Sequence, residues 1–122
     1  MSKIRRGATA HRAGLAAEDV AARVYEAEGA AILARRWRCE YGEIDLILRD
    51  GDMLVFAEVK RRAGPIYDDP VSPKQWRRLE LAAETYIYQA QTGAAPARFD
   101  VVLVDDKGAT EVIKNARETG NG

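Results

Sequence analysis

Apolar residues recur along this chain with two different periods, and each period predicts a different kind of element. Over residues 9–28 they fall three or four positions apart, which predicts an amphipathic helix that Gly29 can close in a left-handed conformation. Glu18 lies beside this stripe rather than opposite it, so its carboxylate is expected to lean towards the edge of the core. The apolar positions of the stripe are Ala13, Ala17, Val20, Ala21 and Val24.

A strand pattern follows the helix. Residues 31–34 predict a first strand, and residues 35–41 lead to the next. Residues 43–49 and 53–60 then alternate around Asp50-Gly51, a sequence typical of a tight hairpin because Gly accepts a positive φ.

The hairpin register can be tested against its chemistry. A two-residue loop at Asp50-Gly51 pairs residues whose numbers add up to 101, and it places Asp45 and Glu58 on one face as diagonal neighbours, roughly 7–8 Å apart. The opposite face is then wholly apolar. Its residues are Ile44, Leu46, Leu48, Met53, Val55, Ala57 and Val59.

A second helix is predicted to begin after Ser72, an N-cap residue followed by Pro73 and by Gln75 of a capping box. Its apolar stripe continues to about residue 92, where Gly93 ends it. Residues 98–104 are nearly continuous in apolar side chains, which predicts a strand inside the sheet, and residues 111–113 predict an edge strand. The helical stripe consists of Trp76, Leu79, Ala83, Tyr86, Ile87 and Ala90.

This order of helix, three strands, helix and strand predicts an α/β fold with a mixed central β-sheet flanked by helices, in three layers. At 122 residues the chain is long enough for one core and too short for two. We therefore expect a single domain over residues 1–122, with mobile ends at 1–8 and 115–122.

Composition narrows the class of protein. Apolar content of 47% and charged content of 31% fit a soluble protein, and no apolar run approaches the roughly 20 residues that span a bilayer. The basic N-terminus is not followed by an apolar segment, so a cytoplasmic location without membrane contact is expected. Cys39 has no cysteine to pair with, and we expect it to be a structural or incidental thiol.

The charges balance overall but cluster locally. Nineteen acidic and nineteen basic residues argue against a general nucleic-acid binder. Two basic clusters nevertheless carry a tryptophan, so they could form a guanidinium-rich groove beside an acidic site, or they could be solvated faces with the tryptophans packed inward. The candidate nucleic-acid-binding residues are Arg35, Arg36, Arg61, Arg62, Lys74 and Arg77.

Two motifs concentrate the candidate chemistry. Gly42-Glu43-Ile44-Asp45-Leu46-Ile47 and Phe56-Ala57-Glu58-Val59-Lys60 place acids and a lysine at the ends of two adjacent apolar strands. Unpaired charge is costly there unless a cation is bound, which suggests a divalent-metal site acting on phosphate. A purely structural ion-paired cluster is the alternative.

These motifs, followed by Lys74 and by Arg98-Phe99-Asp100, resemble those of the YraN-type family of small bacterial proteins, over roughly residues 14–104. An aspartate on one strand and Glu-x-Lys on the next also resemble the restriction-endonuclease-like nucleases. The pattern is similar to that of archaeal junction resolvases as well, once Glu18 is included.

The resemblance implies a restriction-endonuclease-like core and specific roles for its residues. Asp45, Glu58 and the backbone carbonyl of Val59 would hold Mg²⁺ or Mn²⁺, with Glu18 reaching in directly or through water. Lys60 would position the attacking water or the phosphate. Glu43 would hold Lys60 or an outer-shell water.

The expected activity is metal-dependent endonucleolytic hydrolysis of DNA with low sequence specificity, and branched or structured DNA is a candidate substrate. A homodimer would be needed for paired cuts. One alternative is a non-catalytic nucleic-acid-binding or assembly module that retains the fold, and another is a small regulatory protein with a structural ion cluster. Gln89 is expected at the surface, and Asp100 is expected to be a buried partner of a basic residue.

Overall fold

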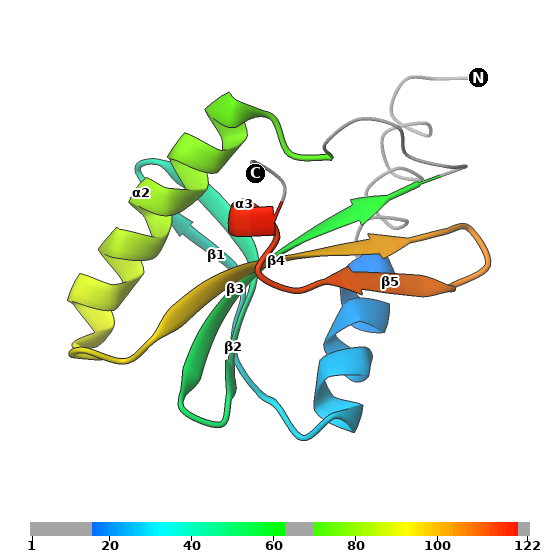
Figure 1. Ribbon diagram of the computed structural model, residues 1–122, viewed down its shortest axis with the longest axis horizontal. Helices are drawn as coiled ribbons and strands as arrows, with labels where there is room; N and C mark the ends of the chain where they lie inside the picture. Colours follow the sequence, from blue (N-terminus) through cyan, green and yellow to red (C-terminus); the bar gives the residue numbers. More distant parts are fainter. Residues whose placement is uncertain (1–15, 63–69, 120–122) are drawn as a thin grey trace.

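The computed structural model describes residues 16–62 and 70–119 (Figure 1). The predicted first helix is present over residues 16–27, and its expected start at residue 9 lies outside the described residues. Gly29 follows this N-terminal helix with a φ of +94°, as expected for a glycine that ends a helix.

The described residues form a five-stranded mixed sheet in the order β1-β2-β3-β4-β5. Only the β3–β4 pair is parallel within this sheet, and the other neighbours are antiparallel. β4 is internal and β5 is at the edge, as predicted. The strands are β1 (Ala31–Cys39), β2 (Gly42–Asp50), β3 (Met53–Arg61), β4 (Ala97–Val104) and β5 (Thr110–Ile113).

Helix α2 (Pro73–Ala90) joins the two parallel strands. Its start is as predicted, with Ser72 as N-cap, Pro73 in the first turn and a complete capping box with Gln75. Its end differs, because Gln91 and not Gly93 forms the left-handed cap, with a φ of +53°. The helix therefore closes before the predicted glycine is reached.

Two apolar clusters lie on opposite faces of the sheet, which gives the predicted three layers (Figure 1). The α2-side core packs Trp76 and Leu79 against Ile47 and Phe56. The other cluster, here called the N-terminal-helix-side core, is formed chiefly by Ala17, Ala21, Tyr25, Leu46, Leu48, Val55 and Val102. The apolar alternation of β2 and β3 thus covers both faces.

The tryptophans pack inward, which was one of the two alternatives for the basic clusters. Trp76 is 1% exposed and meets the ring of Phe99 edge to face. Trp37 makes a similar contact with Tyr86, at a centroid distance of 5.3 Å. The buried indole of Trp76 is therefore closed to bases, whereas that of Trp37 is half-buried.

The β2–β3 hairpin forms, but its predicted loop was wrong by one position. Asp50 pairs with Met53, so the loop is Gly51-Asp52 and paired residue numbers add up to 103 instead of 101. Gly51, with a φ of +62°, takes the first loop position, where a type II′ turn requires glycine. The shift moves Glu58 from a diagonal position to the one that extends the ladder directly opposite Asp45.

Asp100 is buried at 1% exposure and forms the structural network expected of it. Its carboxylate accepts hydrogen bonds from Arg98 at 3.0 and 3.2 Å, from the Tyr25 hydroxyl at 2.8 Å and from the Asn115 backbone at 3.0 Å. The short helix α3 (Ala116–Thr119) follows, with Ala116 buried. The segment after residue 115, expected to be mobile, thus begins with residues attached to the sheet.

No helix among the described residues is long and apolar enough to cross a membrane. Cys39 is a partly exposed free thiol that packs against the α2-side core. Gln89 is exposed on α2, as expected.

Candidate metal centre

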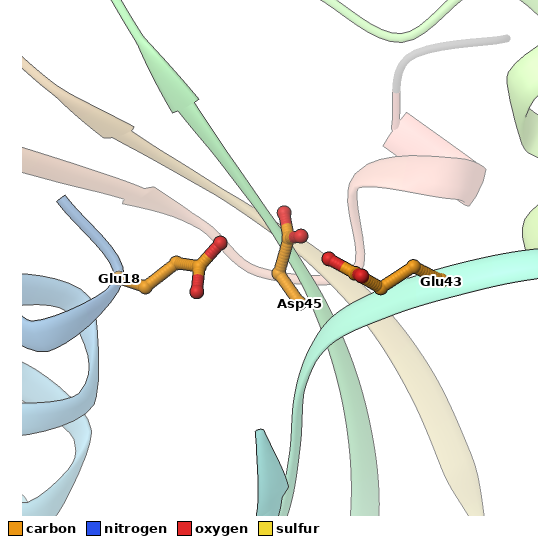
Figure 2. Close-up of side chains that lie close together, drawn as sticks. All are labelled: Glu18, Glu43 and Asp45. Carbon is orange, nitrogen blue, oxygen red and sulfur yellow. The ribbon is translucent and has the colours of Figure 1, made fainter. Parts of the chain in front are cut away.

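Three carboxylates converge where the N-terminal helix meets β2 (Figure 2). Glu18 comes from the helix, and Glu43 and Asp45 come from the start of the strand. One oxygen from each side chain lies within 4.8 Å of the others, a spacing that lets all three bind the same cation. The acid triad, as we call these three residues, contains two of the predicted ligands, Glu18 and Asp45.

A break in the alternation of β2 turns Asp45 towards the helix. Ile44 and Ile47 both belong to the α2-side core, whereas Leu46 belongs to the opposite core. The ladder with β1 pairs Arg35 with Leu46 and Trp37 with Ile44 but leaves Arg36 and Asp45 unpaired. The prediction that Ile44 shares a face with Leu46 was therefore wrong, because a strand needs an irregularity to place two such residues on opposite cores.

Backbone geometry fixes the Asp45 side chain. The backbone N–H of Val59 donates a hydrogen bond to Oδ2 of Asp45 at 2.8 Å. This contact begins beyond Leu46–Ala57, the last regular pair of the β2–β3 ladder at this end. The Asp45 carboxylate is thereby held at the point where the two strands separate.

Glu58 lies against Asp45. It lines a cavity of about 220 Å³ with residues of α2, and it is outside the acid triad. Burial, followed by a hydrogen bond and charge repulsion from Asp45, raises the pKa of Glu58 to about 9, although Lys60 and Arg78 act in the opposite direction. Without a cation nearby, this environment therefore favours the protonated form of the Glu58 carboxyl.

Glu18 also has a perturbed pKa. Burial, and then the negative charge of Asp45, raises it to about 6, while the nearby Arg36 lowers it. The pKa values of Glu18 and Glu58 are thus both raised beside Asp45. Raised carboxyl pKa values are common at sites that bind cations, because a bound cation would lower them.

Arg36 supplies part of that positive charge from within the protein. Its guanidinium lies 3.5 Å from Glu18 and 3.5 Å from Glu43, so it bridges two members of the acid triad. Arg38 binds Glu43 more closely, at 2.9 Å. Arg36 adopts a φ of +51°, a left-handed conformation that costs a non-glycine residue roughly 1 kcal/mol or more and is frequent at functional sites.

The other candidate nucleic-acid-binding residues fall into two groups. Arg35 and Arg62 bind Asp19 and Glu111 at 2.6 and 3.1 Å, so their charges are partly neutralised, like that of Arg36. The remaining three are exposed and have no ion-pair partner among the described residues. They are Arg61, Lys74 and Arg77.

Sequence reasoning gave Glu43 a subordinate role, whereas the structure places its carboxylate in the triad. Its position two residues before Asp45 was the available signal, because residues i and i+2 of a strand share a face. For Val59, the predicted carbonyl ligand, the structure shows an additional role through its N–H.

The donor set fits a hard divalent cation. Carboxylate oxygens are the ligands that Mg²⁺ and Mn²⁺ prefer, and the acid triad consists of carboxylates alone. Asp45 is central to this donor set. It contacts Glu58, and one of its oxygens lies within 4.8 Å of an oxygen of Glu18 and of an oxygen of Glu43.

Fold and site together define a small α/β protein with a helix-flanked mixed sheet and an acidic cluster at the start of its second strand. Residues 17–104 match the model of the uncharacterised protein family UPF0102, and the chain belongs to this family. The YraN-type family that the motifs resembled is thereby confirmed.

Relatives in several bacteria match over most of their length. A UPF0102 protein of Ruegeria sp. (strain TM1040) is 44% identical over 115 residues, which cover 91% of each chain. Another, of Neisseria gonorrhoeae (strain NCCP11945), is 39% identical over 110 residues, or 86% of this chain and 94% of its own. A third, of Ruegeria pomeroyi, is 43% identical over 113 residues.

Proposed function

We propose that this protein is a metal-dependent endonuclease that hydrolyses phosphodiester bonds in DNA. The observation that carries the proposal is the convergence of Glu18, Glu43 and Asp45 within 4.8 Å, with Glu58 against Asp45 and Lys60 two residues further along β3. Clustered acids repel phosphate, so they are useful to a DNA-binding protein chiefly when a cation lies between them and the backbone.

Asp45 and Glu58 would hold the metal together with Glu18, and Glu43 would be a further ligand or would bind a coordinated water. Bound Mg²⁺ or Mn²⁺ supplies two things, a lower pKa for its water and neutralisation of charge on the phosphate. The Val59 N–H keeps Asp45 in place, which spares the site a reorganisation cost. Lys60, close enough to lower the pKa of Glu58, would orient the attacking water or a phosphate oxygen.

The substrate is proposed to be DNA of branched or otherwise irregular structure. A small domain has little surface with which to read bases, so shape and backbone charge would dominate recognition. Paired cuts on two strands would need two copies of the chain. The cytoplasm, where such DNA occurs in bacteria, is the proposed location.

Cleavage of labelled single-stranded, duplex, flap and four-way-junction DNA tests the proposal. With Mn²⁺ or Mg²⁺, the wild type should cut at least one substrate, and D45N and K60A should each reduce the rate by at least about 100-fold. D52N is the matched control, since it removes the same charge from the exposed hairpin loop, and it should cut at the wild-type rate.

Two results would contradict the activity. If the wild type cuts nothing, or if D45N cuts as fast as D52N, the chain is not a nuclease that uses this site. DNA binding without any cutting would instead favour the module that retains the fold without catalysis.

A further inference from the structure

A cavity that carries an arginine lies on the α2 side of the acids. The 220 Å³ cavity between the start of β2 and the first turns of α2 has two acids on one wall, Glu43 and Glu58. The opposite wall carries Gln75 and Arg78 of α2. A ligand in this cavity would therefore touch both the residues proposed to bind metal and an arginine.

Arg78 is held over Gly42, and the glycine is needed for this arrangement. A methyl group added at Gly42 would lie 3.2 Å from Cδ of Arg78, which is closer than ordinary contact. The φ of Gly42 is +130°, a conformation that other residues rarely adopt. The backbone thus makes room for the Arg78 side chain at the mouth of the cavity.

The charge of Arg78 is not consumed by a close partner. Arg36 and Arg38 both bind acids within 4.0 Å, whereas Arg78 has no ion pair among the residues that the structure describes. Its field does reach Glu58, whose pKa it lowers. The first turn of α2 contains no acid, so the positive end of the helix adds to the same potential.

We propose that Arg78 binds a backbone phosphate of the nucleic acid in this cavity, next to the phosphate at the metal centre. A guanidinium in a concave site matches a phosphate diester, because its planar fork can donate two hydrogen bonds to two oxygens. Gln75 accepts from the Ser72 N–H through its Oε1 and keeps its amide N–H groups for the same ligand. This assignment rests on the proposed function, and it makes Arg78 a substrate-binding residue that adds to the candidates predicted from sequence.

Fluorescence anisotropy with a short labelled DNA, single-stranded and as a duplex, tests the assignment in millimolar Ca²⁺. R78Q should weaken binding about tenfold and reduce the slope of log Kd against log salt by about one, as expected for one lost phosphate contact. R78K, which keeps the charge, should retain most of the slope. R49Q, which removes the same charge at the far end of β2, should change the affinity less than about twofold.

Thermal unfolding of each variant separates binding from a structural role. If R78Q is folded and binds DNA with the wild-type affinity and salt slope, the assignment is wrong, and Arg78 only balances the charge of Glu58. If the wild type binds DNA and R78Q alone loses the contact, the assignment stands. If the wild type binds neither probe, the proposed function and this inference fail together, whereas failure of R78Q alone leaves the nuclease proposal intact.

Discussion

At the scale of single residues, Arg36 occupies the place where a cation is proposed to bind. Its guanidinium bridges Glu18 and Glu43 at 3.5 Å each, and its backbone is held in a left-handed conformation. A divalent ion that binds the acid triad has to compete with this internal positive charge. The residue selected from the sequence as a contact to DNA is therefore first of all a counter-ion of the site.

Removal of the Arg36 charge should strengthen metal binding. We expect R36Q to lower the Kd for Mn²⁺ a few-fold, since partly exposed ion pairs are worth about 0.2–1 kcal/mol. Isothermal titration calorimetry measures this directly. R49Q is the control, because Arg49 is exposed and lies at the far end of β2 from the acid triad. Weaker Mn²⁺ binding by R36Q would show that Arg36 organises the acids rather than competing with the ion.

Glu58 should make the metal-free protein less stable as the pH rises. Its pKa in the folded state is about 9, against 4.5 for the ordinary carboxyl, so between these values the folded state binds more protons than the unfolded state. The free energy of unfolding therefore falls through this window. Urea denaturation from pH 5 to pH 8 should show E58Q gaining about 1 kcal/mol or more over the wild type. An equal pH dependence in both proteins would contradict the raised pKa.

At the scale of elements, two features shape the start of β2. Gly42 leaves room for the Arg78 side chain, and a break in the alternation of the strand turns Asp45 towards the N-terminal helix. The hydrophobic pattern predicted the strands, α2 and its cap, because alternation and capping residues act locally. It could not choose between loops at Asp50-Gly51 and Gly51-Asp52. With either loop, the same residues of β2 and β3 lie on the same face of the sheet, so the apolar pattern fits both.

The break in the alternation of β2 at Asp45 could not be predicted from the sequence, for a different reason. It lies beside Arg36 of the neighbouring strand and beside the helix that presents Glu18, and neither neighbour can be deduced from the pattern of β2 alone. Asp45 was singled out by its motif at the end of a strand, and the ligand role of Glu18 came from the family resemblance. The place of Glu43 in the triad required the geometry.

Substitution of Gly42 by alanine tests how closely Arg78 packs against the start of β2. G42A should lower the free energy of unfolding by about 1–3 kcal/mol, because the new methyl group meets Arg78 and the φ of +130° disfavours alanine. G108A is the matched control, with a φ of +85° and no atom within 4 Å of the added methyl group. Chemical denaturation of both variants compares the costs. Equal losses would mean that Arg78 moves aside freely.

At the scale of the whole molecule, Asp100 joins segments that are far apart in sequence. It connects the N-terminal helix through Tyr25, its own strand through Arg98, and the segment that leads into α3 through Asn115. Burial, together with the charge of Asp100, raises the pKa of the Tyr25 hydroxyl far above its ordinary value, so the hydroxyl stays protonated and donates. The sequence predicted the arginine partner, but not the tyrosine 75 positions away.

Loss of the Asp100 charge should therefore affect the whole fold. We expect D100N to reduce the free energy of unfolding by about 3–5 kcal/mol, because the largely buried Arg98 would keep only its longer ion pair with the half-exposed Asp50, at 3.4 Å. Y25F removes one hydrogen bond and should cost only about 1 kcal/mol. Urea denaturation distinguishes the two, and similar small losses would show that the buried carboxylate contributes little beyond its packing.

The central claim is that the acids around Asp45 form one cation site, and calorimetric titration of Mn²⁺ into the metal-free protein at pH 8 tests it most directly. We predict uptake of a divalent ion by the wild type, a Kd at least about tenfold weaker for D45N, and wild-type binding by D52N. No uptake at millimolar Mn²⁺, or equal binding by D45N and the wild type, would contradict the account.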